Sequence, residues 1–266
     1  MIRILSTIFC LLTILWANAQ NLHLQNQPLL AQAQINNLPQ SGLVAWWKAD
    51  SIPSSTANGT PMGNTTNGTT WIDSSGNGHD LTQNVVASRP VYHTGSAGIF
   101  GGLNCVDFTT SGFALNLASA VTLSNFTILS VVKYAGVSTD GILIGSLSLN
   151  RQVRRQQNIL RTFDGSGEAV SNPVFVSTTN GYLTVFKRTF TNITFMACTN
   201  LAFVMWPTND PIASLVLDDL GASPPSGVGT LQGFLAEMAI YNYEMDTNQV
   251  ISVYTNYFKP KWRLVN

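Results

Sequence analysis

Short apolar runs, each closed by glycine, serine or asparagine, follow one another through most of this chain and limit the folds that it can adopt. The runs are rich in β-branched and aromatic residues, which favours strands. No long helical segments alternate with them, so the pattern indicates an all-β sandwich or barrel and not an alternating α/β fold. We expect strands at residues 43–48, 99–108, 113–117, 126–134, 142–149, 159–163, 174–177, 182–190, 193–197, 201–206, 212–217 and 234–241.

One short helix is expected near the C-terminal end. Apolar residues between positions 250 and 258 follow a helical spacing, Asp246 is a candidate N-cap, and Pro260 is expected to end the helix. In the first strand, adjacent Trp46 and Trp47 point to opposite sides, so at least one of them must face the core. The predicted fold is a two-sheet antiparallel jelly-roll sandwich with one short C-terminal helix.

Four pieces of sequence occur in an order that is characteristic of one family. They are residues 42–51 (GLVAWWKADS), 71–83 (WIDSSGNGHDLTQ), 89–92 with 102–108, and 233–245 (GFLAEMAIYNYEM). Together they resemble the laminin-G-like (LamG or pentraxin-like) branch of the concanavalin A-like lectin/glucanase superfamily. The resemblance implies the jelly-roll fold but no single activity, because that superfamily includes lectins, hydrolases, lyases and structural modules.

The N-terminal segment has the features of a secretory signal. Arg3 precedes an apolar run at residues 4–16, and Ala17-Asn18-Ala19 forms a small-residue cleavage site. We therefore expect a signal peptide at 1–19, a flexible leader at 20–41 and one domain at 42–266; a retained N-terminal anchor is the alternative. We expect the mature chain to have no membrane span and to be secreted or held at the cell surface.

Two cysteines, Cys105 and Cys198, remain after the predicted cleavage. Disulfides persist in secreted proteins, and two cysteines allow one pairing. Both residues lie in strand-like sequence, where free thiols are often buried. A bridge and two free thiols are equally compatible with the sequence.

The stretch at 71–83 contains the best candidate for a metal site. Calcium binds carboxylate, amide and hydroxyl oxygens supplied by a loop, and Asp73, Ser75, Asn77 and Asp80 lie within eight residues. The favoured alternative is an Asx-turn, in which the same side chains cap backbone amides without a metal. If this stretch does bind a cofactor, calcium is the candidate.

Basic and aromatic residues supply candidates for ligand binding. Arg151, Arg154 and Arg155, with Arg161 nearby, could bind the carboxylate or sulfate groups of an acidic polysaccharide. The alternative is a solvated hairpin edge that its charges protect from aggregation. Trp206, at a predicted strand end beside a proline, could stack on a sugar ring.

The sequence lacks the motifs of the enzyme classes that this fold suggests. Glycosidases of the superfamily carry Glu-x-Asp-x-Glu on one strand, but the three glutamates here, Glu168, Glu237 and Glu244, do not have that spacing. Serine-nucleophile and zinc-protease motifs are also missing. Equal numbers of basic and acidic residues, 13 of each, argue against nucleic acid binding. We expect no enzymatic activity.

These observations favour a secreted or surface-associated, non-catalytic module for carbohydrate binding or adhesion. Its expected partner is a glycan or polysaccharide, either neutral or acidic. The first alternative is a structural or protein-binding module of an extracellular assembly, and a polysaccharide-degrading enzyme is the weaker one. We expect the functional residues on loops around positions 53–80, 150–156 and 206–211.

Overall fold

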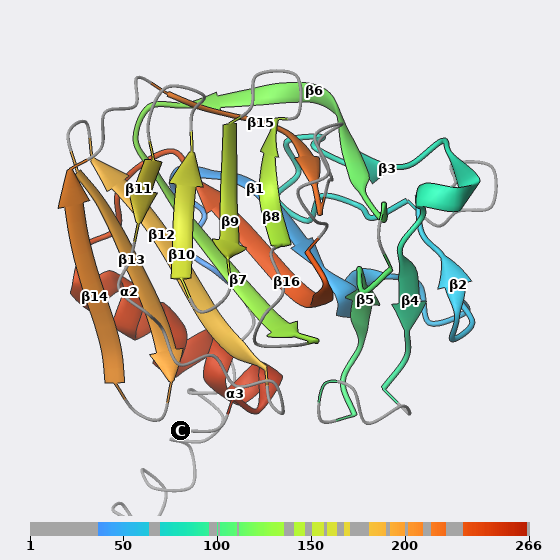
Figure 1. Cartoon of the computed structure of the whole chain (residues 1–266). Coiled ribbons are helices and arrows are strands. Elements are labelled where there is room, and N and C mark those ends of the chain that lie inside the picture. The colour runs from blue at the N-terminus through green and yellow to red at the C-terminus, as the bar shows by residue number, and fades with distance from the viewer. Residues whose placement is uncertain are drawn as a thin grey trace, which may run out of the picture.

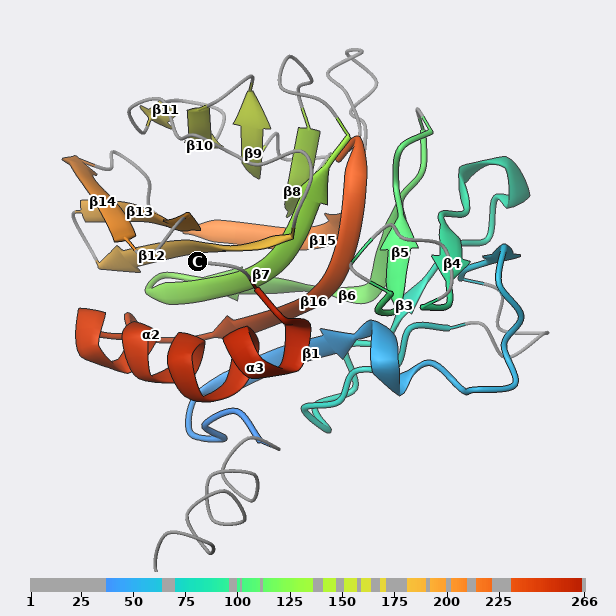
Figure 2. The same cartoon turned by 90° about the horizontal axis from the view of Figure 1, so that it is seen from below.

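Two antiparallel sheets pack face to face in the computed structural model of this chain (Figures 1 and 2). This arrangement confirms the predicted all-β sandwich. The predicted signal peptide, most of the leader and the predicted strand at 174–177 lie outside the described residues. The structure describes residues 37–63, 70–95, 100, 102–110, 112–135, 141–146, 151–156, 159–163, 168–170, 181–189, 192–199, 202–209, 214–221 and 231–264.

The larger sheet has nine strands in the described ranges. Eight of them follow one another in a continuous order, and the ninth, β1, pairs with β16 outside that order. The order runs through β14 (Ala202–Asn209), β13 (Asn192–Thr199), β12 (Tyr182–Thr189), β7 (Phe126–Tyr134), β16 (Gly233–Tyr241), β5 (Cys105–Asp107), β4 (Val91–His93) and β2 (Thr60–Pro61), with β1 at Leu43–Lys48.

The smaller sheet has seven strands in the described ranges. Its path runs through β11 (Glu168–Val170), β10 (Ile159–Phe163), β9 (Arg151–Gln156), β8 (Gly141–Ser146), β15 (Leu215–Leu220), β6 (Leu115–Leu123) and β3 (Leu81–Thr82). The predicted loop around 150–156 is therefore wrong: β9 pairs with β8 on one side and β10 on the other. The predicted loop at 206–211 begins inside β14.

The C-terminal helical segment covers the outer face of the larger sheet (Figure 2). It consists of α2 (Thr247–Val253), the π-helical turn η4 (Tyr254–Phe258) and α3 (Lys259–Trp262). Because the helix lies on one face and the smaller sheet on the other, the central strands are buried on both sides. All residues of β16 except Phe234 are buried.

Both tryptophans of β1 are also buried, because this strand too is covered on both sides. The exposed fraction is 3% for Trp46 and 0% for Trp47. Trp46 makes an edge contact with Tyr257 of the helical segment, at 6.0 Å between ring centroids. The Trp47 Nε1–H donates to the carbonyl oxygen of His79. The core also includes Leu38, upstream of the predicted domain start at residue 42.

The helix begins as predicted but ends later than predicted. The Asp246 carboxylate accepts from the Gln249 N–H, and the Gln249 side chain accepts from the Asp246 N–H, which forms a capping box. Pro260 does not end the helix, which continues to Trp262. The π-helical turn changes the hydrogen-bond pattern before Pro260, so this proline lies in the first turn of α3, where its missing N–H is tolerated.

Cys105 is a free, buried thiol in β5, so the predicted alternative of a bridge to Cys198 is wrong. Burial raises the pKa of the Cys105 thiol to about 12, and the nearby Asp107 carboxylate adds to the effect. Cys198 lies in β13 opposite Phe203, and its side chain is outside the described residues. The Cys105 thiol therefore acts as a small apolar side chain of the core.

Candidate functional site

The turn at residues 73–80 is held together by one buried carboxylate. Asp73 Oδ1 accepts from the backbone N–H groups of Trp46 and Ser75, both at 2.9 Å. Its Oδ2 accepts from the Ser75 hydroxyl at 2.8 Å and from the His79 N–H at 3.0 Å. Asp73 is only 5% exposed. The carboxylate thus fastens the turn to β1 and fills its acceptor positions with protein donors.

The other predicted calcium ligands belong to the same hydrogen-bond network. Asp80 Oδ1 accepts from the Asp73 N–H at 2.7 Å, and the Asn77 amide donates to the carbonyl oxygens of Leu43 and Val44. Gly76 and Gly78 have positive φ angles of 82° and 80°, as the turn requires. Within the described ranges, no three histidine, cysteine or acidic side chains gather closely enough to bind a metal together. The contacts are those of the Asx-turn alternative, and calcium stays a prediction.

A second buried carboxylate, Glu237 of β16, joins the first strand to the C-terminal helix. Its Oε1 accepts from the Trp46 indole N–H at 2.5 Å and from the Tyr257 hydroxyl at 2.7 Å. Its Oε2 accepts from Lys261 Nζ at 2.8 Å and from the Trp262 indole N–H at 2.5 Å. Burial, followed by the Glu237 charge, raises the pKa of the Tyr257 hydroxyl well above its usual range.

These contacts bring together the four sequence pieces that carry the family resemblance. The first piece binds Asp73 of the second through its backbone, and it binds Glu237 of the last through Trp46. The third piece supplies β4 and β5, and β5 pairs with β16. The most distinctive residues of the sequence therefore include Trp46, Asp73 and Glu237, whose contacts hold these pieces of the fold together.

Two lysines, Lys261 and Lys48, lie beside the Glu237 cluster. Lys261 also forms an ion pair with Asp50, at 3.2 Å. Lys48 Nζ lies 4.1 Å from the centre of the Trp46 ring, in a cation–π contact. Burial, and then the charge of Lys261, lower the pKa of Lys48. The sequence predicted the strand at 234–241, but it did not predict these partners of Glu237.

The predicted arginine cluster is divided between two faces of β9. Arg155 is fully buried between the sheets, and its guanidinium lies 4.3 Å from the centre of the Tyr134 ring. Burial raises the pKa of Tyr134 to about 12, although Arg155 opposes this shift. Arg154 is half-buried on the other face, opposite Arg161 of β10. Arg155 therefore cannot serve a surface ligand in this arrangement, whereas Arg154 and Arg161 share one face.

Two predicted ligand-binding residues are described by their backbone alone. Arg151 pairs with Ser146 of β8, and Trp206 pairs with Phe195 of β13. Their side chains lie outside the described part of the chain. The binding roles predicted for these two residues stay predictions.

Most acidic side chains in the described ranges form hydrogen bonds or ion pairs within the fold. His93 lies between Asp107, at 3.2 Å, and Asn58, at 3.3 Å. Other acidic side chains and the groups that they contact are Asp50 with Lys261, Asp80 with the Asp73 amide, Asp107 with His93, Asp218 with Ser146, Glu244 with Lys187 and Asp246 with the Gln249 amide. These carboxylates have structural partners; the side chain of Glu168 is outside the described part.

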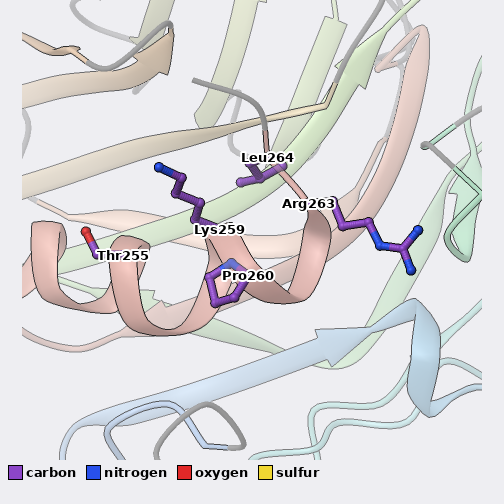
Figure 3. Close-up of a pocket in the computed structure, with 5 residues that line it drawn as sticks. All are labelled: Thr255, Lys259, Pro260, Arg263 and Leu264. Atoms are coloured by element: carbon purple, nitrogen blue, oxygen red, sulfur yellow. The ribbon is translucent and has the colours of Figure 1, made fainter. Parts of the chain in front are cut away.

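A pocket of about 450 Å³ lies beside the end of the C-terminal helix (Figure 3). It is largely open to solvent and combines two cations, one hydroxyl group and two apolar side chains. The helical segment supplies Thr255, Lys259 and Pro260, and Arg263 and Leu264 follow directly after its last residue, Trp262. Sequence reasoning missed this site, since Pro260 was expected to end the helix before it. The lining residues are Thr255, Lys259, Pro260, Arg263 and Leu264.

No family model matches the chain, and no curated protein matches it. Solved structures with a related arrangement include domain 4 of AbnA, a GH43 extracellular arabinanase from Geobacillus stearothermophilus, in complex with arabinotriose. That match has a TM-score of 0.49 and 13% identity and covers 79% of this chain and 97% of the other.

Two further matches involve sialidases. Trypanosoma rangeli sialidase gives a TM-score of 0.45 at 11% identity, over 81% of this chain and 33% of the other. The CBM40 of Ruminococcus gnavus IT-sialidase, bound to α2,3 sialyllactose, gives 0.40 at 12% identity, over 49% and 82%. At these identities and TM-scores, the matches assign neither a family nor a function to this chain.

Proposed function

We propose that this chain is a secreted or cell-surface carbohydrate-binding module of the laminin-G-like type, without catalytic activity. The pocket beside the C-terminal helix is the observation that carries the proposal. Its volume, about 450 Å³, lies in the range of small-ligand sites. Hydrogen-bond donors next to apolar side chains suit a sugar, which presents hydroxyl groups at its edge and C–H groups on its faces.

The roles of the described carboxylates support a non-catalytic function. A glycosidase needs two carboxyl groups on opposite sides of a sugar, held about 5–10 Å apart with access to the bond that breaks. Glu237 is fully buried and meets four donors, and Asp73 is fastened inside its turn. Neither of these two carboxylates is available for proton transfer to a bound sugar.

Secretion and surface attachment rest on the predicted signal peptide at 1–19. None of the helices in the described ranges has the length and apolar character that a membrane span requires. Processing is tested by expressing the full chain with its natural N-terminus and sequencing the product. An N-terminus at Gln20 supports secretion, whereas a retained residue 1 contradicts it.

The binding function is tested on a broad panel of immobilised glycans and polysaccharides, once with calcium and once with a chelator. Saturable binding to a glycan supports the proposal, and its loss in chelator would add a metal at Asp73 to Asp80. The Thr255→Trp variant, which fills the pocket, should lose that binding, while Ser88→Trp, outside the lining, should keep it. Binding that survives Thr255→Trp would place the site elsewhere on the fold.

A structural or protein-binding module is the second candidate. Val85 and Val86 are large apolar side chains that are 59% and 70% exposed, and exposed apolar groups of this kind favour contact with another protein. If the folded protein binds no glycan on the panel, this candidate replaces the first.

A further inference from the structure

Two cations that line the pocket have no acidic partner in the described part of the chain. Lys259 and Arg263 form neither an ion pair nor a side-chain hydrogen bond there. Lys261, which lies between them in sequence, is held by Glu237 and Asp50. The helix therefore uses one of its three terminal cations for its own packing and leaves two for another partner.

The surroundings of these cations are suited to a sugar ring. Pro260 and Leu264 add apolar surface between and below them, and Thr255 adds a hydroxyl that can donate or accept (Figure 3). An inorganic anion would use the charges alone. A saccharide with anionic groups would use the charges, the apolar surface and the hydroxyl together.

The directions of the side chains indicate how such a ligand is charged. Figure 3 shows Lys259 and Arg263 extending to opposite sides of the helix end, with Leu264 between them. One carboxylate cannot engage both groups when they diverge in this way. Two anionic groups on separate sugar units of one chain could engage one cation each, and the arginine could hold its anion in a bidentate manner.

We propose that this pocket selects an acidic oligosaccharide, with carboxylate or sulfate groups on more than one sugar unit. This inference rests on the proposed carbohydrate-binding function and adds the class of ligand. The whole chain has balanced charge, with 13 basic and 13 acidic residues, so general attraction of polyanions would not explain such a preference.

The test compares probes that differ only in charge, by calorimetry at 150 mM salt. Oligogalacturonate is compared with its methyl ester, and dextran sulfate with dextran, so that the two arms distinguish a carboxylate from a sulfate preference. We expect at least tenfold tighter binding of one acidic probe than of its neutral counterpart. Galacturonate monomer should bind at least tenfold more weakly than the oligomer.

Variants then locate the preference. Lys259→Gln and Arg263→Gln should each weaken binding of the acidic probe about tenfold, while Lys133→Gln, which removes the same charge outside the lining, should not change it. Cations in the last turn of a helix also stabilise the helix dipole, so urea unfolding of each variant is measured as well. Lower stability with unchanged affinity would mean that these cations serve only the helix, and would overturn the inference.

The outcomes separate this inference from the proposed function. Equal affinity for acidic and neutral probes would overturn the acidic preference and leave carbohydrate binding intact. Tight binding to a neutral glycan from the broad panel, with none to acidic probes, would have the same meaning. A lack of binding to every glycan by the folded protein would overturn both.

Discussion

Replacement of Glu237 with glutamine should lower the free energy of unfolding by about 3–5 kcal/mol. The carboxylate accepts from four donors: two indole N–H groups, one hydroxyl and one ammonium. Glutamine has one oxygen with two acceptor positions, and its NH₂ group is itself a donor. The amide therefore cannot satisfy the cluster in either orientation.

The expected loss in unfolding free energy follows from the amide orientation that costs less. If the amide oxygen faces Lys261 and Trp262, the NH₂ group can donate to the Tyr257 hydroxyl, but the Trp46 indole N–H loses its acceptor. An orphaned buried donor costs about 1–3 kcal/mol. Lys261 also loses a charged acceptor at 2.8 Å, worth about 1.5–3 kcal/mol, and keeps the partly exposed Asp50 carboxylate and the uncharged Tyr257 hydroxyl as acceptors.

Urea unfolding, followed by tryptophan fluorescence and far-UV circular dichroism, measures this loss. The matched control is Glu244→Gln, which removes the same charge from a partly exposed side chain; its partner Lys187 is buried but keeps the Met245 carbonyl oxygen as an acceptor, so the loss should be smaller, about 1–2 kcal/mol. A loss below about 1 kcal/mol for Glu237→Gln, with an unchanged dependence on urea, would refute the assigned role of this carboxylate.

Two further predictions concern the turn and the buried thiol. Asp73→Asn should cost about 1–3 kcal/mol, because an amide NH₂ replaces an acceptor of the His79 N–H; an equal loss in calcium and in chelator supports a turn cap, and a loss seen only in calcium supports a metal site. The Cys105 thiol should resist labelling at pH 8 in a folded Cys198→Ser chain that begins at Gln20, and it should react once urea unfolds the chain. Burial raises its pKa from 9.0 to about 12, so between these values the unfolded chain releases a proton that the folded chain keeps, and stability should fall as pH rises. Cys105→Ala should make the fall smaller, and an unchanged fall in urea midpoints between pH 8 and pH 11 would contradict this explanation.

Local sequence patterns predicted most of the sandwich because strand period, turn residues and helix caps act over a few neighbouring residues. Asp246 as the N-cap and the strand at 234–241 are examples. The strand β9 was missed since its sequence, RQVRRQ, lacks the apolar alternation of a half-buried strand. Its buried Arg155 depends on Tyr134, a contact that composition cannot predict.

The candidate site was harder to predict than the fold for a related reason. Trp46 and Glu237 are 191 residues apart, and only the register of β1 on β16 brings them together. The pocket depends on a π-helical turn that allows the helix to pass Pro260. Neither the strand register nor this local change of helix type has a clear signal in the sequence.

The position of β16 determines when the chain can fold during its synthesis. This strand is made after β1, β5 and β7, yet it lies between β7 on one side and β1 with β5 on the other. In a nascent chain that stops before Gly233, all three of these strands lack β16 as a partner. Their unpaired backbone N–H and C=O groups can then pair with other chains. Closure of the sheet must join residue 43 to residue 241, so folding is expected to be slow and to occur only after residue 241 has been made.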